Sequence, residues 1–425
     1  MRNATAEGEL LHVASSGSRT VEAEPDLDHM GFLCDTWADF LLERSEDLTR
    51  LLTEIATRDS AVAELDSAIA TLRGGRAEMR QFEGTTGGRV CTFLPSNNVL
   101  YSYVLFGLMP GLWSDEVLIR PSARTREAVF ALHGILAGLP HNPVTMADVS
   151  QREFVALCRE ARTVVFTGRY ENLHAIRESI PSAVPILGFG SGPNPVVAGP
   201  FADVAEVVRE TTSSRLFNGG QDCLCPDLLI AHSSIYPELR ERLAHAFAEV
   251  PRAPRERPGL VIPPMFYNDA FEAASAFIET HREKVFSGGT VDERNLRLEP
   301  TVVEFPCLSE THPPELFSPV ICLTSYHEAT EVRAWLTSET ETERGMYVSV
   351  YGEPGLPDPV LGTSVNCGPR TSFQAEDGNR PFGGYGRRAS ARWQAGEVAA
   401  RPLLLSREAG PHPAADAVGT PLVAR

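Results

Sequence analysis

The feature that most constrains the fold is an alternation of short apolar runs with helical stretches between about residues 90 and 195. The run at 90–94 is predicted to be a strand, and the runs at 117–119 and 164–166 are predicted to be buried strands, each followed by a loop and a helix. This pattern predicts an α/β fold with a parallel sheet covered by helices. Ligands bind such sheets beyond the carboxyl ends of the strands, where Arg120 and Gly168 lie.

Helical periodicity precedes this region. Apolar residues spaced i, i+3, i+4 and i+7 predict an amphipathic helix over about 48–55, and a second helix is predicted over about 62–72, ending near Gly75. Residues 1–30 show little periodicity and are predicted to be a disordered arm. The tail from Ser406 is rich in Ala and Pro and is predicted to be mostly unstructured.

The composition restricts the function as well as the fold. With 425 residues, of which 43% are hydrophobic, the chain is long enough for two domains with cores of their own. A net charge of -18 argues against general binding to nucleic acid, which needs a basic face. The first 30 residues are acidic and polar, unlike a signal peptide, and no apolar run approaches the ~20 residues of a membrane span. We therefore expect a cytoplasmic protein that binds neither nucleic acid nor membrane.

The eight cysteines are scattered and lie mostly in apolar contexts, which indicates reduced thiols rather than a disulfide framework. Cys223 and Cys225 lack Cys or His partners at zinc spacing, so no metal site is expected. Cys223 follows Gly219 and Gly220 and precedes the apolar run 228–231, which predicts a tight turn leading into a buried strand. Taken alone, this turn favours a small buried hydrophobe over a reactive thiol.

Six segments carry a further signal. In chain order they are Pro95-Ser96-Asn97, Ile119-Arg120-Pro121-Ser122, Phe166-Thr167-Gly168, 217–223, 314–320 and Pro381-Phe382-Gly383-Gly384. With these segments, residues from about 40 to 405 resemble the aldehyde dehydrogenase superfamily, in which a Gly-Gln-x-Cys turn presents a catalytic thiol. The resemblance implies a two-lobed α/β fold, with a Rossmann-like cofactor-binding domain over 31–190 and a catalytic domain over 191–390. A C-terminal segment and flexible tail are expected over 391–425.

The resemblance also assigns catalytic roles. It implies that Cys223 is the nucleophile and that the side chain of Asn97 binds the carbonyl oxygen as that oxygen gains charge. It assigns Glu315 to the nicotinamide ribose of a cofactor, with Phe317 at the same site. From the residues alone, Asn97 is an ordinary loop-capping side chain and Glu315 a surface carboxylate.

Some cofactor positions depart from the family pattern. Arg120, which is followed closely by Ser122, replaces a lysine that reaches a ribose or a phosphate as a cation. Ala123 replaces the acidic residue that binds the adenosine ribose hydroxyls in members that prefer NAD. Because Arg124 is next to it, the altered site favours NADP over NAD.

Gly168 and Arg169 lie where the resemblance places the pyrophosphate of the cofactor. Arg169 replaces a small hydroxyl residue, and its guanidinium either pairs with phosphate or obstructs the site. No G-x-G-x-x-G fingerprint directly follows a strand, so the usual dinucleotide motif does not support the assignment.

The most informative departure is a glycine-rich loop. Its residues of interest are Gly188, Gly190, Gly192 and Asn194. Hydrolytic aldehyde dehydrogenases carry a glutamate at the start of this loop, which acts as the general base. Gly188 occupies that position here, and no carboxylate occurs over 182–202. Acylating aldehyde dehydrogenases and acyl-CoA reductases also lack this glutamate and have similar loops. The resemblance to that branch implies that a thiol of coenzyme A or of an acyl or peptidyl carrier protein delivers or accepts the acyl group.

Three hypotheses remain open. The first is NAD(P)H-dependent reduction of an acyl thioester to an aldehyde, or the reverse oxidation, through an adduct on Cys223. The second is a conventional aldehyde dehydrogenase that forms a carboxylic acid. The third is an inactive binding or scaffold protein, which Arg169 and the atypical segment 387–399 favour. The segment between Gly75 and Gly88 is shorter than in the family, so the usual oligomer is not expected and a homodimer is one option.

Overall fold

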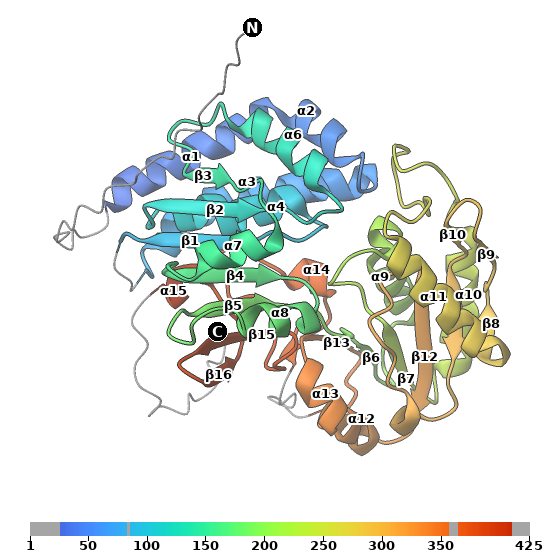
Figure 1. Ribbon diagram of the computed structural model, residues 1–425. Coiled ribbons are helices and arrows are strands. Elements are labelled where there is room, and N and C mark those ends of the chain that lie inside the picture. Colours follow the sequence, from blue (N-terminus) through green and yellow to red (C-terminus); the bar gives the residue numbers. More distant parts are fainter. Residues whose placement is uncertain (1–25, 83–85, 357–363, 410–425) are drawn as a thin grey trace, which may run out of the picture.

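The computed structural model describes residues 26–82, 86–356 and 364–409. Within these ranges two seven-stranded sheets organise the chain into two lobes (Figure 1). The first lobe holds the N-terminal helices, and the second begins near the green middle of the chain. The α/β fold with a parallel sheet, predicted from the sequence, is confirmed.

The first sheet has the strand order β16-β15-β5-β4-β1-β2-β3. Strands β1 to β5 pair in parallel, whereas β15 and β16 are antiparallel additions at one edge. The strands are β1 (Arg89–Phe93), β2 (Glu116–Arg120), β3 (Val144–Met146), β4 (Thr163–Thr167), β5 (Ile186–Phe189), β15 (Ser390–Gln394) and β16 (Glu397–Ala400).

Helices cover both faces of this sheet, so neighbouring residues of one strand pack into two different hydrophobic cores. Val90 belongs to a core shared with the N-terminal helices and α6, whereas Cys91 packs with side chains of α7 and α8. The helices are α1 (Leu27–Glu43), α2 (Ser45–Leu52), α3 (Arg58–Met79), α4 (Val99–Tyr103), the π-helix η1 (Val104–Leu108), α5 (Met109–Gly111), α6 (Arg126–Leu136), α7 (Gln151–Cys158) and α8 (Tyr170–Arg177). No helix of the described ranges is long and apolar enough to cross a membrane.

The second sheet has the order β14-β13-β6-β7-β12-β11-β8. Its strands are β6 (Val196–Ala198), β7 (Leu228–His232), β8 (Val285–Ser287), β11 (Thr301–Glu304), β12 (Val320–Tyr326), β13 (Tyr347–Tyr351) and β14 (Val365–Asn366). A two-stranded ribbon contains β9 (Val291–Asp292) and β10 (Arg297–Leu298). The surrounding helices are α9 (Val204–Arg215), η2 (Phe217–Gly220), α10 (Tyr236–Glu249), α11 (Asn268–Thr280), η3 (Arg282–Lys284), η4 (Leu308–Glu310), α12 (Ala329–Leu336), α13 (Glu339–Arg344) and α14 (Ser372–Ala375).

Two predicted boundaries near the N-terminus are wrong. Helix α1 begins at Leu27 because the side chain of Asp26 caps its first turn, so the arm predicted to reach residue 30 stops earlier, and residues 1–25 lie outside the described ranges. Helix α3 does not end near Gly75 but continues to Met79. A Cβ atom at Gly75 would lie 2.6 Å from Sγ of Cys34 in α1, so this glycine permits close helix packing rather than ending the helix.

The C-terminal segment completes the first lobe. Strands β15 and β16 extend its sheet, and α15 (Leu405–Glu408) follows, although the chain from Ser406 was predicted to be unstructured. Burial explains the helix, because Glu408 forms a buried ion pair with Arg392 of β15 at 3.2 Å. Residues 410–425 of the predicted tail lie outside the described ranges.

Candidate active site

A cavity of about 1020 Å³ is lined by residues of both lobes and lies beyond the carboxyl ends of β1, β2 and β4. Ten of the residues predicted from the sequence line it, namely Asn97, Arg120, Ser122, Arg124, Gly168, Arg169, Gly190, Cys223, Glu315 and Phe317. The structure therefore brings the predicted thiol, its amide partner and the predicted cofactor residues to one cavity.

The turn that carries Cys223 has a backbone that glycine makes possible. Asn218, Gly219 and Gly220 have consecutive left-handed conformations, with φ of 51°, 64° and 80°. A Cβ atom at Gly220 would lie 2.2 Å from the carbonyl oxygen of Ser318. The turn is thus pressed against a neighbouring loop, and Cys223 emerges half-buried at the cavity wall.

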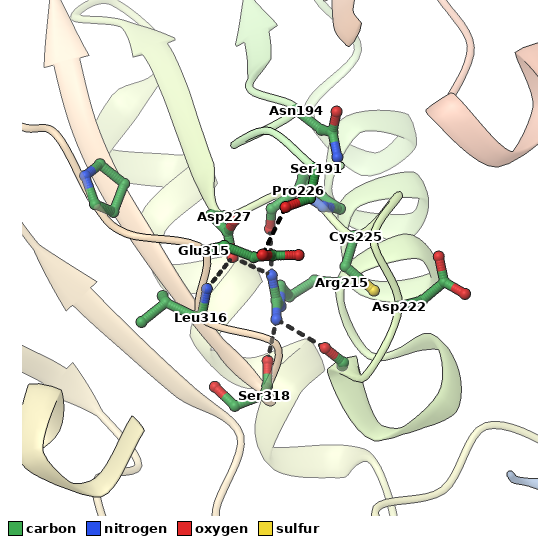
Figure 2. Close-up of polar contacts among 12 residues, drawn as sticks. Ser191, Asn194, Arg215, Asp222, Cys225, Pro226, Asp227, Glu315, Leu316 and Ser318 are labelled. Atoms are coloured by element: carbon green, nitrogen blue, oxygen red, sulfur yellow. Dashed lines mark hydrogen bonds and ion pairs between the residues drawn. The ribbon is translucent and has the colours of Figure 1, made fainter. Parts of the chain in front are cut away.

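Arg215, the last residue of α9, lies beside this turn and binds its backbone (Figure 2). It is fully buried and pairs with Oδ1 of Asp227 at 2.6 Å. Its guanidinium also donates to the carbonyl oxygens of Gly220 and Pro226, both at 3.1 Å, and to that of Ser318. Nothing in the sequence marked this residue, because an arginine in the last turn of a helix is usually a surface residue.

The loop that carries Asn97 is tied to the cysteine turn by its neighbours. The amide of Asn98 donates to the carboxylate of Asp222 at 2.8 Å, and the hydroxyl of Tyr267 donates to the carbonyl oxygen of Ser96 at 2.6 Å. Asn98 has a left-handed φ of 50°, which turns the chain into α4. These contacts fix the loop on which Asn97 faces the same cavity as Cys223.

Asn194 also binds the turn that carries Cys223, but it does not line the cavity. Its buried amide donates to the carbonyl oxygen of Cys223 at 2.7 Å and accepts from the backbone N–H of Tyr347 at 3.3 Å. Asn194 therefore positions the backbone of Cys223, whereas the sequence placed Asn194 only in the glycine-rich loop.

The thiol of Cys223 is held in its neutral form. Desolvation raises its pKa well above the ordinary value, and the nearby carboxylates of Asp222 and Glu315 raise it further. A thiol nucleophile attacks as the thiolate. A nucleophilic role for Cys223 would therefore need a proton acceptor or a positive charge near the sulfur.

Arginines gather at the strand ends. Arg124 and Arg169 both pair with Oδ2 of Asp269 on α11, at 2.8 and 2.7 Å. Arg120 ends β2 and donates to the carbonyl oxygen of Val149 at 3.2 Å. Gly168 has a positive φ of 145° before α8 begins. The hydroxyl of Ser122 accepts a hydrogen bond of 3.4 Å from the backbone of Arg124.

Glu315 and Phe317 come from the loop before β12. The hydroxyl of Ser191 donates to Glu315 at 2.6 Å, as Figure 2 shows. Solvent reaches this carboxylate through the cleft, but the enclosing protein desolvates it and raises its pKa to about 7. Phe317 packs its ring against Tyr267 with 5.4 Å between the ring centroids. Both residues thus face the cavity from the second lobe.

The glycine-rich loop differs from the prediction. A Cβ atom at Gly188 would lie 2.4 Å from Leu173 and 2.5 Å from Trp393, so this position faces the core and not the cavity. Gly192 also points away, toward the backbone of Arg344. The residues of this stretch that line the cavity are Phe189, Gly190 and Ser191. Gly188 therefore does not mark the place from which a carboxylate would reach Cys223, although none of the lining residues of this loop is a carboxylate.

Several carboxylates of the cavity wall were not identified as site residues from the sequence. Three of them, Glu64 of α3, Asp222 of the cysteine turn and Glu376 after α14, are here called the carboxylate cluster, and Glu78, Glu210 and Asp269 line the cavity as well. Desolvation raises the pKa of both Glu64 and Glu376 to about 7, and the charge of Asp222 contributes to each shift. Their positions far apart in sequence left no motif that could have grouped them.

A two-lobed α/β fold with a thiol and a group of arginines on one cavity, beyond the ends of parallel strands, is an arrangement that suits a nucleotide-binding oxidoreductase. The chain belongs to the aldehyde dehydrogenase family, whose pattern matches residues 31–355. An aspartate-semialdehyde dehydrogenase (non-phosphorylating) from Halomonas elongata is 26% identical over 55% of this chain and 49% of its own length. The chain thus matches about half of that relative.

Two further comparisons agree with this assignment. A glutarate-semialdehyde dehydrogenase from Pseudomonas putida is 23% identical over 72% of this chain and 69% of its own length. The crystal structure of a succinic semialdehyde dehydrogenase from Streptococcus pyogenes, in complex with NADP+, superposes with a TM-score of 0.78. It is 14% identical and covers 89% of this chain and 90% of its own. This likeness supports the fold.

The residues present fit a nicotinamide dinucleotide. The cavity lies beyond parallel strand ends, where such sheets bind nucleotides, and it offers Arg120, Arg124 and Arg169 for phosphates. Glu315 is a carboxylate that can accept from ribose hydroxyls. Binding of NAD(P) therefore agrees with the family and with the side chains of the cavity.

Proposed function

We propose that the protein interconverts an acyl thioester and an aldehyde with NAD(P)H or NAD(P)+, through a covalent adduct on Cys223. The observation that carries the proposal is a single cavity that joins Cys223 and Asn97 to the arginines, while the loop residues Phe189 to Ser191 contribute no general base. The thiol of coenzyme A or of a carrier protein needs no such base to accept the acyl group, because a useful fraction of that thiol is ionised near neutral pH.

The protein residues have defined roles in this scheme. In the reductive direction the sulfur of Cys223 loses its proton and attacks the thioester carbonyl carbon, the bond to the carrier sulfur breaks, and the released carrier thiolate takes up a proton. Asn97 donates to the carbonyl oxygen, which carries the developing charge. A bound NAD(P)H would supply the hydride that, together with a proton, reduces the acyl group on Cys223 to a thiohemiacetal. The C–S bond then breaks, the aldehyde leaves and Cys223 is regenerated.

Finer assignments accompany this proposal. The thiol is that of coenzyme A or of a carrier protein, because both present a thioester on a long arm. The cofactor is NADP rather than NAD, which the absence of a carboxylate at Ala123 and the presence of Arg124 support. Relatives named for semialdehyde oxidation are consistent with an aldehyde as the second reactant.

A second candidate is oxidation of an aldehyde to a carboxylic acid. It is favoured by Glu64, which lines the cavity with a pKa raised to about 7 by desolvation. A carboxyl group with a pKa near the working pH is suited to activating water. In this scheme Glu64 takes over the role of the glutamate that the glycine-rich loop lacks.

The two candidates differ in their products. The purified protein is incubated with a panel of aldehydes and NADP+ or NAD+, with and without coenzyme A, and the products are separated by liquid chromatography. Acyl-CoA formed only with coenzyme A supports the thioester reaction, whereas acid formed equally without it refutes that reaction. Acid formation that is lost in Glu64→Gln supports the second candidate. No turnover by the wild type, together with no nucleotide binding, would overturn both and leave a scaffold.

A further inference from the structure

Tyr267, from the second lobe, binds the loop of the first lobe that carries Asn97. The residue immediately precedes α11, is only 3% exposed and lines the cavity. Its hydroxyl donates to the carbonyl oxygen of Ser96 at 2.6 Å. Because Ser96 immediately precedes Asn97, this hydrogen bond holds the backbone next to the side chain that is assigned to the carbonyl oxygen of the substrate. Tyr267 is therefore placed to set the position of Asn97.

The cysteine turn in turn holds Tyr267. Oε1 of Gln221 accepts from the backbone N–H of Phe266 at 2.9 Å and from that of Tyr267 at 3.3 Å. Gln221 is buried and lies two residues before Cys223. A chain of hydrogen bonds therefore runs from the turn of the thiol, through Gln221 and Tyr267, to the backbone beside Asn97. In the interior of a protein such a chain is stronger than the same contacts in water.

A second contact joins the same two loops on the other side of Asn97. The amide of Asn98 donates to the carboxylate of Asp222 at 2.8 Å. The two contacts together anchor the backbone before and after Asn97, whereas one of them alone leaves the backbone free to pivot. Because a displacement of about 1 Å in an active site can cost about a hundredfold in rate, the loss of one anchor matters for chemistry.

The hydroxyl of Tyr267 acts as a hydrogen-bond donor. Desolvation raises its pKa above the ordinary value, and the charges of Glu64 and Asp222 raise it further. A protonated phenol can donate to a carbonyl oxygen, whereas a phenolate cannot. The hydroxyl thus keeps its proton near neutral pH, which suits an anchor and not a general base.

The ring of Tyr267 contacts the cofactor side of the cavity. It meets the ring of Phe317 edge-on, with 5.4 Å between the centroids, and the guanidinium of Arg124 lies 5.9 Å from its own centroid. Phe317 has a left-handed φ of 44°, which is a strained conformation for a bulky residue and persists only where neighbouring groups hold it. The ring of Tyr267 is one of these neighbours.

We propose that Tyr267 is a positioning residue whose hydroxyl sets the place of Asn97 relative to Cys223. Its ring has a separable role, which is to hold Phe317 and Arg124 for the cofactor. The inference rests on the proposed function, since Asn97 and Cys223 act together only in a reaction at a carbonyl group. Loss of the hydroxyl should slow the chemical step, and loss of the ring should also weaken binding of the cofactor.

Tyr267→Phe removes only the hydroxyl. The single-turnover rate of cofactor reduction, with the aldehyde and nucleotide that the wild type uses best, should fall about 5- to 50-fold, which is less than the roughly 100- to 1000-fold cost of removing an oxyanion donor. The Kd of the nucleotide in calorimetry should stay unchanged, because the ring is kept. In Tyr267→Leu, which removes the ring as well, this Kd should rise severalfold.

Tyr326→Phe is the matched control. Tyr326 is also buried, and its hydroxyl has no hydrogen-bond partner in the described part of the chain, so neither the rate nor the Kd should change. A fall in rate as large as that of Tyr267→Phe would show that any buried hydroxyl has this effect, and would overturn the inference.

A double-mutant cycle separates positioning from a general loss of stability. In the Asn97→Ala background the hydroxyl of Tyr267 has no side chain to position, so Tyr267→Phe should cause no further decrease in rate. An equal decrease in both backgrounds, or an unchanged rate in Tyr267→Phe alone, would overturn the inference while the proposed function stands. No turnover by the wild type would overturn the proposed function, and this inference with it.

Discussion

Asp269 pairs with two arginines that we propose for cofactor phosphates, and its removal should tighten cofactor binding. Arg124 and Arg169 come from the first lobe, whereas Asp269 lies in the first turn of α11 of the second, and both arginines share its Oδ2 atom. A phosphate that pairs with these arginines must first compete with Asp269. Asp269→Asn abolishes the competition but keeps the size of the side chain.

The magnitude follows from the exposure of the pairs. The side chains of Arg124, Arg169 and Asp269 are 49%, 62% and 29% exposed, so each pair is worth about 0.2–1 kcal/mol. Together they oppose binding by at most about 2 kcal/mol, which corresponds to a decrease in Kd of about 2- to 30-fold. The same pairs stabilise the cofactor-free protein, so Asp269→Asn should lower its Tm slightly.

Calorimetry with NADPH and NADH measures the effect, with Glu272→Gln as the control. Glu272 is an exposed carboxylate of the same helix and has no ion pair among the described residues. The gain should shrink at ~1 M salt, where the Debye length is about 3 Å. It should be larger for NADPH if Arg124 contacts the 2′-phosphate. A Kd that stays unchanged or rises in Asp269→Asn, or that falls equally in Glu272→Gln, would refute the reasoning.

Three further predictions concern single residues. Arg215→Met leaves Asp227 buried and unpaired, and we expect the free energy of unfolding in urea to fall by about 3–5 kcal/mol. This loss should be smaller at pH 5 than at pH 8, because desolvation raises the pKa of Asp227 to about 6 and its protonation removes the unpaired charge. Gly220→Ala should abolish activity and lower the Tm, since φ is 80° and the new methyl would meet Ser318; an active, equally stable variant would contradict the assigned backbone. For Glu315, ionisation through its raised pKa makes the carboxylate a stronger acceptor from ribose, so the KM for the cofactor should fall from pH 6 to pH 8, and in Glu315→Gln it should stay flat.

The sequence predicted the sheet because local chemistry defines it. The runs that became β2 and β4 are short, apolar and bounded by loops, and burial on both faces requires that pattern. The loops that follow parallel strands lie at the same edge of the sheet. Arg120 and Gly168, which lie at the ends of two such strands, could therefore be placed together from the sequence.

What the sequence could not supply depends on long-range packing. Gly188 looked like the vacant position of a general base, but the neighbouring Trp393, about two hundred residues later, fills the space in front of it. Arg215 carried no signal in the sequence, because its burial with Asp227 arises only in the folded chain. The carboxylate cluster arises from three distant segments that only the folded chain brings to one wall.

Carboxylates near Cys223 also affect how readily its thiol ionises. Desolvation raises the pKa of its thiol most and the charges of Asp222 and Glu315 raise it further, so a cation bound beside these carboxylates should lower the pKa. Saturating n-butylamine should therefore accelerate alkylation of Cys223 by iodoacetamide near neutral pH, followed by mass spectrometry of the peptide that contains it. The isosteric n-butanol occupies similar space without charge, so it should only slow the alkylation by obstruction. Slower alkylation with both compounds would show that the cation does not lower the pKa of the thiol. The expected electrostatic effect of a cation on thiolate formation would then be wrong.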